Sequence, residues 1–248
     1  MSLTTTTTST CTLAPVLLSI ESTPSNQKST PTCYAHALAA QVHMALKTRK
    51  QRQADQVPVP SVAEIRERLL AEYPPQFQWV KNQGRSESDC WKFDDILNDM
   101  PYLYPPLLSR TVEETRACKI LLKEKRPVLV KIDRGEAKFI ERYIRMHPGP
   151  RVVATQALLF DRDTKYCSEA DMKVGWHAVL LTGYDPATGM CTFLNSYGSN
   201  WGDNGHFRIE NMAVLTGRPE ARIQLVDIYA AEEPKILYSK IHLGGPRR

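Results

Sequence analysis

The chain has 248 residues, of which 42% are apolar and 24% charged, as in globular proteins that bury one core or two packed lobes. The net charge of +5 is mild, and the densest basic run, residues 47–52, is typical of a solvated helix end. The sequence therefore indicates neither a nucleic-acid-binding module nor a membrane-spanning segment. The apolar run at residues 13–20 is too short and too interrupted for a signal peptide, which predicts an intracellular, cytoplasmic protein.

The first half of the chain is predicted to be mainly helical. Residues 1–25 form an arm that the threonine-rich run at 4–10 predicts to be partly disordered. An alanine- and leucine-rich helix follows over residues 33–50, with Thr32 as its expected N-cap. Further helices are predicted over residues 61–72, 92–100 and 111–125, the first and last opening with capping boxes at Ser61 and Thr111. Residues 101–106 are predicted to be a turn.

After Pro127 short apolar runs replace the helical pattern and predict β-strands. The predicted strands are residues 128–132, 177–183, 190–195, 206–209 and 225–229, with one helix at 137–146. We therefore divide the chain into an arm (1–25), a helical lobe (26–126), a β-rich lobe (127–231) and a tail (232–248), with a substrate cleft between the lobes.

Four residues in chain order supply the chemistry for thiolate attack on an amide carbonyl. Cys33 is the expected nucleophile, His177 its base, Asn195 the residue that orients the histidine, and Gln27 a donor to the oxyanion. Placing Cys33 at a helix N-terminus would stabilise its thiolate. Taken alone, Cys33 is equally well explained as a buried core residue, and His177 is better explained as a core histidine; the four residues together favour the catalytic interpretation. His36, three residues after Cys33, is expected to pack rather than react.

The cysteines favour a reduced protein without a metal site. None of the six, at positions 11, 33, 90, 118, 167 and 191, forms the C-x-x-C spacing of a zinc site. With Cys33 as the nucleophile five remain, an odd number that cannot pair completely. We therefore expect free thiols, as in intracellular proteins, and no metal.

The chain resembles papain-like cysteine peptidases in three motifs. These are Gln27 with Cys33, His177 followed by a strand and Gly183-Tyr184, and the glycine- and aromatic-rich run from Asn195 to Gly205. The sequence separation between Cys33 and His177 lies within the roughly 130–150 residues expected in such enzymes. The separation between Cys33 and Asn195 is slightly larger than that range. The resemblance implies an α+β, papain-like fold of two lobes, one helical and one β-rich and barrel-like.

The sequence departs from that family near the cleft. Thr30 stands where the family has a structural cysteine, Tyr197 where it has tryptophan, and residues 83–91 replace a glycine-rich substrate segment. The resemblance implies that the cleft is lined by Gly84, Trp176, Tyr197 and Trp201. Because only 32 residues precede Cys33, we expect a distant member without a helical prosegment.

The expected activity is peptide-bond hydrolysis through a Cys33 thioester, with a peptide or protein as substrate and a protein inhibitor as a further candidate partner. No cofactor is expected. A transpeptidase, ligase or deamidase could use the same thioester, and a catalytically silent peptide-binding protein is the alternative outside enzymes. The sequence does not predict subsite preference, endo- or exopeptidase action, or oligomeric state.

Overall fold

The computed structural model describes residues 14–20, 24–28, 32–53, 58–74, 77–80, 85–88, 93–147, 149, 152–155, 176–216 and 222–231. The helices are α1 (Cys33–Gln53), α2 (Val62–Glu72), α3 (Phe93–Leu103), α4 (Glu114–Lys119), the π-helix η2 (Ile120–Glu124), α5 (Arg134–Met146) and the 3₁₀-helix η6 (Met212–Thr216). The strands are β1 (Val16–Leu17), β2 (Phe77–Val80), β3 (Arg85–Ser88), β4 (Leu107–Val112), β5 (Val128–Asp133), β6 (Val153–Ala154), β7 (Trp176–Tyr184), β8 (Cys191–Leu194), β9 (His206–Ile209) and β10 (Ile223–Ala230).

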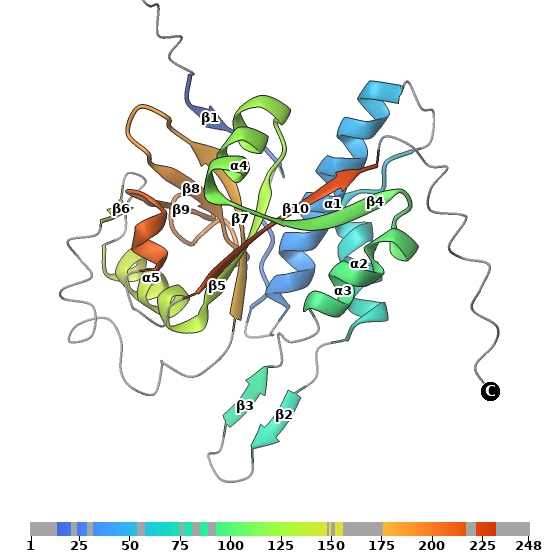
Figure 1. Ribbon diagram of the computed structural model, residues 1–248. Coiled ribbons are helices and arrows are strands. Elements are labelled where there is room, and N and C mark those ends of the chain that lie inside the picture. The colour runs from blue at the N-terminus through green and yellow to red at the C-terminus, as the bar shows by residue number, and fades with distance from the viewer. Residues whose placement is uncertain are drawn as a thin grey trace, which may run out of the picture.

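An eight-stranded sheet forms the centre of the fold (Figure 1). Its order is β4-β10-β5-β7-β8-β9-β6, and β1 pairs with the end of β7. All pairs in this sheet are antiparallel except β6 with β9. Strands β2 and β3 form a separate antiparallel pair. The mixture of helices and a mainly antiparallel sheet confirms the predicted α+β class.

Strands β5 and β7 are buried on both faces, which explains their unbroken apolar sequence. Because side chains alternate along a strand, Leu129 and Leu180 pack into one core, whereas Val130 and Val179 pack into another. Helices α1, α2 and α3 cover the first face, and α4, η2 and α5 contribute to the core on the second. The sheet is therefore the middle layer of the molecule.

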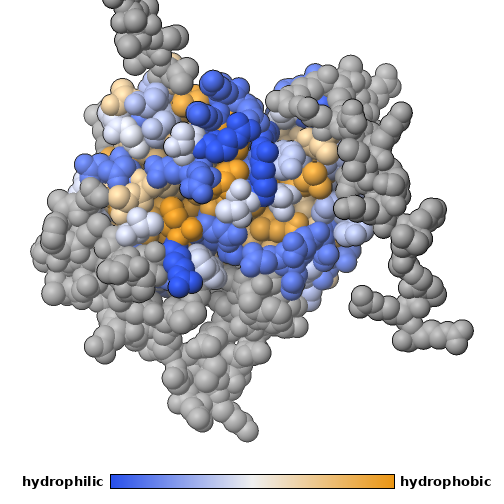
Figure 2. Space-filling model, in the orientation of Figure 1, coloured by the Kyte–Doolittle hydropathy of each residue, from blue (hydrophilic) through white to orange (hydrophobic). Residues whose placement is uncertain are grey.

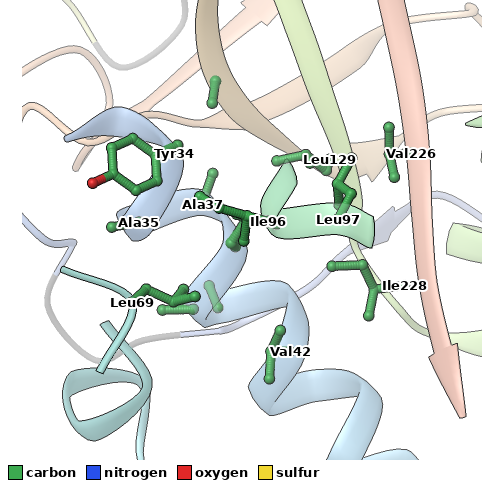
Figure 3. Close-up of a cluster of buried hydrophobic side chains, with 14 of the residues drawn as sticks. Tyr34, Ala35, Ala37, Val42, Leu69, Ile96, Leu97, Leu129, Val226 and Ile228 are labelled. Atoms are coloured by element: carbon green, nitrogen blue, oxygen red, sulfur yellow. The ribbon is translucent and has the colours of Figure 1, made fainter. Parts of the chain in front are cut away.

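The first core joins the helices to the sheet (Figure 3). Ala37 and Val42 of α1 lie among Leu69 of α2, Ile96 of α3 and Leu129 of β5. Every residue of α1 from 33 to 42 is buried, as expected for a helix enclosed by other elements. Gln41 adds a polar link, because its side-chain amide donates to the Val226 carbonyl of β10 at 2.8 Å.

The capping box predicted at Ser61 is confirmed, and the one predicted at Thr111 is wrong. The Ser61 hydroxyl accepts the Glu64 N–H at 3.2 Å, and the Glu64 carboxylate accepts the Ser61 N–H at 2.7 Å. Thr111 instead lies in β4, opposite Val226 of β10, and α4 begins only at Glu114 without a side-chain cap. Pairing with β10 through residue 112 engages the backbone that a cap would use.

Helix α3 extends through Pro101, where a turn was predicted. Proline lacks the N–H that would bond the carbonyl four residues earlier. Here the Ser109 hydroxyl donates to that carbonyl, on Leu97, at 3.1 Å. A side chain from β4 therefore replaces the missing backbone donor, which the local sequence could not reveal.

Two strands of the main sheet come from segments predicted to contain none, and so do β2 and β3 of the separate pair. β4 lies within residues 26–126, the predicted helical lobe, yet forms the edge of the main sheet beside β10. β1 lies in the predicted arm and pairs Val16 with Tyr184 of β7. The sheet therefore draws on both segments that were expected to lie outside the β-rich lobe.

Hydrophilic side chains predominate on the described surface in the view of Figure 2, and hydrophobic ones appear in small groups between them. Among the described residues, no helix is both long and apolar enough to cross a bilayer.

A buried charge network joins β10 to the start of β5. Asp227, fully buried, accepts hydrogen bonds from Arg126 at 2.5 Å and from Arg110 at 2.8 Å. The Arg126 side chain is 4% exposed and also donates to the Ile228 carbonyl at 2.6 Å and to Glu124 at 2.6 Å. The buried guanidinium is thus fully surrounded by acceptors.

This network predicts unequal effects of its members on stability. Asp227→Asn should lower the free energy of unfolding by about 3–5 kcal/mol, because it leaves the buried Arg126 charge without its main counter-charge. Arg110→Ala should cost about 1 kcal/mol or less, because the Arg110 side chain is 41% exposed. Urea denaturation of both variants checks this, and equal costs would contradict it.

Candidate active site

Cys33 opens helix α1. The Thr32 carbonyl accepts the N–H groups of Ala35 at 3.0 Å and His36 at 3.3 Å, which starts the helix at Cys33. Cys33 is 3% exposed, and the first turn of α1 contains no acidic residue. The positive end of the helix therefore acts on the Cys33 sulfur without an opposing carboxylate from its own first turn, which favours the thiolate.

His177 and Asn195 come from neighbouring strands and meet by a hydrogen bond. The His177 Nε2–H donates to Asn195 Oδ1 at 2.9 Å, and both residues are buried. The Ser196 backbone N–H donates to the same oxygen at 2.8 Å, which identifies that atom as the acceptor of the amide. In the neutral ring Nδ1 is then the acceptor nitrogen, so the hydrogen bond selects the tautomer that can take a proton at Nδ1.

A small cavity of about 10 Å³ lies between α1 and the sheet, beside Asn195. Ala37, one turn after Cys33 on the same face of α1, lines it together with Ala178 and Asn195. Ala178 is the residue after His177 on β7. Cys33 therefore lies one helical turn from this cavity, on the side of α1 that faces β7.

Gln27 is held beside the Asn195 turn by backbone and side-chain bonds. Its N–H donates to the Ser196 carbonyl at 2.8 Å, and the Gly198 N–H donates to the Ser25 carbonyl at 3.0 Å. The Gln27 Oε1 accepts the Ser196 hydroxyl. Because the two ends of an amide lie on opposite sides, the Gln27 NH₂ group is turned away from Ser196.

Gly198 is required by this close approach. Its φ is +82°, and a side chain there would meet the Asn26 side chain at 3.0 Å. Positive φ occurs also at Gly202 and Gly205, a conformation that glycine adopts without steric cost.

Aromatic rings cover the His177–Asn195 bond. Tyr197 stacks on the His177 ring with 5.4 Å between centroids, and Trp201 meets Tyr197 edge-on at 5.4 Å. Of the predicted cleft residues, Tyr197 thus contacts the histidine and Trp201 supports Tyr197 from behind. Trp176 precedes His177 and lies against Lys131 of β5, while Gly84 falls outside the described residues.

Sequence reasoning missed a second polar layer behind the site. His36 hydrogen-bonds through Nδ1 to the Ser25 hydroxyl at 2.7 Å, and both line the cavity that Asn195 and Ser196 also line. Burial, together with the positive charge of Arg66, lowers the His36 pKa from 6.5 to about 4. His36 is therefore neutral at pH 7. Its i, i+3 spacing from Cys33 was the one sequence signal of its proximity.

The other described cysteines differ from Cys33 in their surroundings. Cys118 and Cys191 are unpaired, buried thiols. Burial raises the pKa of Cys118 to about 11 and that of Cys191 to about 12. Cys11, Cys90 and Cys167 fall outside the described residues. Within the described ranges, no group of three or more His, Cys, Asp and Glu side chains could hold a metal ion.

No protein-family model matches the chain. Similar solved structures include xylellain, a cysteine protease from Xylella fastidiosa, at 14% identity and a TM-score of 0.46, covering 89% of this chain and 87% of that one. Bromelain from Ananas comosus, bound to the inhibitor E64, has 15% identity and a TM-score of 0.45, with coverages of 87% and 95%. Procathepsin L2 from Tenebrio molitor has 15% identity and a TM-score of 0.39, covering 83% of this chain and 64% of that one.

The chain thus resembles papain-like cysteine proteases distantly and in fold alone. The proposal that follows draws on the side chains of the site.

The environments of the thiols predict selective alkylation. At mildly acidic pH, limiting iodoacetamide should label Cys33 before Cys118 and Cys191. All three thiols are buried, but of the three only Cys33 opens a helix, whose positive end favours the thiolate. Mass mapping of the labelled peptides measures the order. Cys33→Ala should abolish the fast phase and serves as the control. Similar rates at all three positions would contradict the prediction.

The His36 pKa predicts a loss of stability in acid. A depressed folded-state pKa means that the unfolded chain binds a proton first, so this contribution is complete above about pH 6.5 and is lost as the pH falls towards about 4. The loss is on the order of 2 kcal/mol. His36→Gln and His36→Phe do not titrate, so their free energies of unfolding should fall less over that interval. Parallel curves for all three proteins would contradict this.

Proposed function

We propose that the chain is a cysteine-type amide hydrolase that cleaves peptide bonds through a Cys33 thioester. The observation that carries the proposal is the 2.9 Å bond from His177 Nε2–H to Asn195 Oδ1, buried beneath Tyr197. A histidine held by an amide oxygen presents its other nitrogen as a base. Cys33 at the start of the helix that packs against the histidine strand supports the same reaction.

Acylation follows from these positions. His177 Nδ1 takes the Cys33 thiol proton, and the sulfur attacks the peptide carbonyl carbon. The resulting oxyanion is stabilised by the Gln27 NH₂ group and by backbone N–H groups at the start of α1. The imidazolium then returns the proton to the leaving nitrogen as the C–N bond breaks, which leaves a thioester and a free amine.

Deacylation uses the same groups in reverse. His177 takes a proton from water, the hydroxide oxygen attacks the thioester carbonyl, and the C–S bond breaks. The sulfur regains its proton and a carboxylic acid leaves. Asn195 keeps the ring in one orientation through both halves, and Tyr197 excludes water from the bond that orients it.

A peptide library incubated with residues 1–248 tests the proposal. Hydrolysis gives fragments whose summed mass exceeds that of the parent by one water. Joined fragments would indicate a transpeptidase or ligase, and an intact chain with one amide converted to acid would indicate a deamidase. No turnover by a folded protein that still binds peptides would indicate the silent alternative.

The roles of the supporting residues predict a ranked loss of activity. His177→Ala should remove turnover almost completely. Asn195→Ala removes only the orientation of the base, so it should retain more activity than His177→Ala. Gln27→Ala should lower kcat by about 10²–10³, as when one oxyanion donor is lost. Initial rates on one cleaved peptide measure all three.

The matched controls lie away from the site. Asn211→Ala removes an amide that caps η6 by accepting the Ala213 N–H at 3.0 Å. Gln224→Ala removes a surface bond from its amide to the Thr111 hydroxyl at 3.2 Å. Both should retain wild-type rates. An unchanged rate for Gln27→Ala would mean that the oxyanion is stabilised by other groups.

A further inference from the structure

Lys131 is a buried cation that the proposed reaction does not use. It lies on β5 opposite Ala178 of β7, one position from the pair formed by Ile132 and His177. Sheet spacing puts the Lys131 and His177 Cα atoms about 6 Å apart. The Lys131 side chain is only 5% exposed.

Two aromatic rings from different elements flank the ammonium. The Lys131 Nζ lies 5.1 Å from the centroid of Phe93, the first residue of α3, and 5.2 Å from that of Trp176. Trp176 immediately precedes His177. The ammonium therefore lies between α3 and the sheet, near the start of β7, on the face of the sheet that Ala178 shares.

The partners of Lys131 leave hydrogen-bonding capacity unused. Among the described residues its one hydrogen bond goes to Asp94 Oδ1, at 3.0 Å. The Asp94 side chain is 65% exposed, so its carboxylate reaches the ammonium from the solvent edge. An ammonium carries three donors, and two of them have no acceptor among the described residues.

A structural role explains this arrangement poorly. The two rings attract the ammonium, but an uncharged chain of similar volume would pack between them without the cost of desolvating a charge. The Asp94 carboxylate is 65% exposed, so water weakens its ion pair with Lys131. A buried ammonium held by one carboxylate that water can displace is instead suited to exchange that carboxylate for another.

We propose that Lys131 binds a carboxylate of the peptide substrate, so that the enzyme prefers an acidic group within about three residues of the scissile bond. The group is the side chain of Asp or Glu or a free C-terminal carboxylate. It replaces Asp94 on the Lys131 ammonium, between Phe93 and Trp176. The proposal rests on the proposed function only for the position of the scissile bond.

Matched peptides test the preference. Pairs that differ by Glu or Gln at each position near the cleaved bond, and pairs with a free or amidated C-terminus, give the ratio of kcat/KM values. Wild type should favour one acidic member by about tenfold or more, since a site built to bond a polar group rejects an analogue that lacks it. Equal use of every pair would overturn the proposal.

Three variants identify the residue responsible. Lys131→Met should abolish the preference, and Lys131→Arg should retain it. Asp94→Ala should increase it, because the competing carboxylate is gone. Lys138→Met removes an exposed lysine paired with Glu141, and Asp95→Ala removes the neighbouring exposed carboxylate; both should leave the ratio unchanged.

A structural clamp would give different results. In that case Lys131→Met would lower the melting temperature but keep the ratio of kcat/KM values between acidic and neutral peptides. Asp94→Ala would also leave this ratio unchanged. Both results together would overturn the proposal. If Lys131→Met does not fold, the effect of Asp94→Ala on the kcat/KM ratio decides between the carboxylate site and the structural clamp.

Binding without turnover separates this proposal from the proposed function. In Cys33→Ala, Trp fluorescence titration with the same peptide pairs measures affinity directly. Tighter binding of acidic peptides that Lys131→Met removes would support the carboxylate site even if wild type cleaved nothing. Cleavage without any acidic preference would leave the proposed function standing and remove the carboxylate site.

Discussion

The close packing of the first half of α1 against β7 is the constraint on which the site depends. Ala37 and Ala40 are at most 5% exposed, and their small side chains let the helix backbone approach the sheet. They face Ala178 and Leu180 across the small cavity. A larger residue at either position would push the helix away from the sheet, and Cys33 would move with it relative to His177. The proposed chemistry therefore requires small residues on this side of α1.

A second constraint ties two loops that are distant in sequence. The Gln27–Ser196 and Gly198–Ser25 backbone bonds fix the loop at residues 24–28, which carries the proposed oxyanion donor Gln27, to the turn after β8 that carries Asn195. A shift of either loop would displace Gln27 relative to the His177–Asn195 hydrogen bond. The proposed oxyanion donor and the residue proposed to orient the base are thus held as one unit.

Sequence reasoning succeeded where a local pattern determines the outcome. The strands at 128–132 and 206–209 and the helix starting at Ser61 follow from apolar runs and capping chemistry within a few residues. It failed where a distant partner decides. β4 is a strand because β10 pairs with it, and α3 passes Pro101 because Ser109 supplies the donor that proline lacks. The same division holds for the site. The residue types and order of Gln27, Cys33, His177 and Asn195 are visible in the sequence, whereas the bonds that join His177 to Asn195 and Gln27 to Ser196 are not.

The polar layer of Ser25 and His36 likewise depends on contacts that the local sequence does not reveal. In the sequence only its spacing from Cys33 distinguishes His36 from His43 on the same helix. In the structure His36 hydrogen-bonds to Ser25 beside the Asn195 cavity, and His43 to the Pro60 carbonyl at 2.7 Å. Burial sets the protonation state of His36, and burial is a property of the assembled fold.

Two buried cations of the sheet illustrate how structural and ligand-binding charges differ. Arg126 meets a fully buried carboxylate, a backbone carbonyl and a second carboxylate, so its desolvation is offset within the fold and no place is left for a ligand. Lys131 is buried as deeply but faces two aromatic rings and one carboxylate at the solvent edge. The first arrangement gains nothing from an added anion. The second is completed by one, and it lies beside the strand position that carries His177.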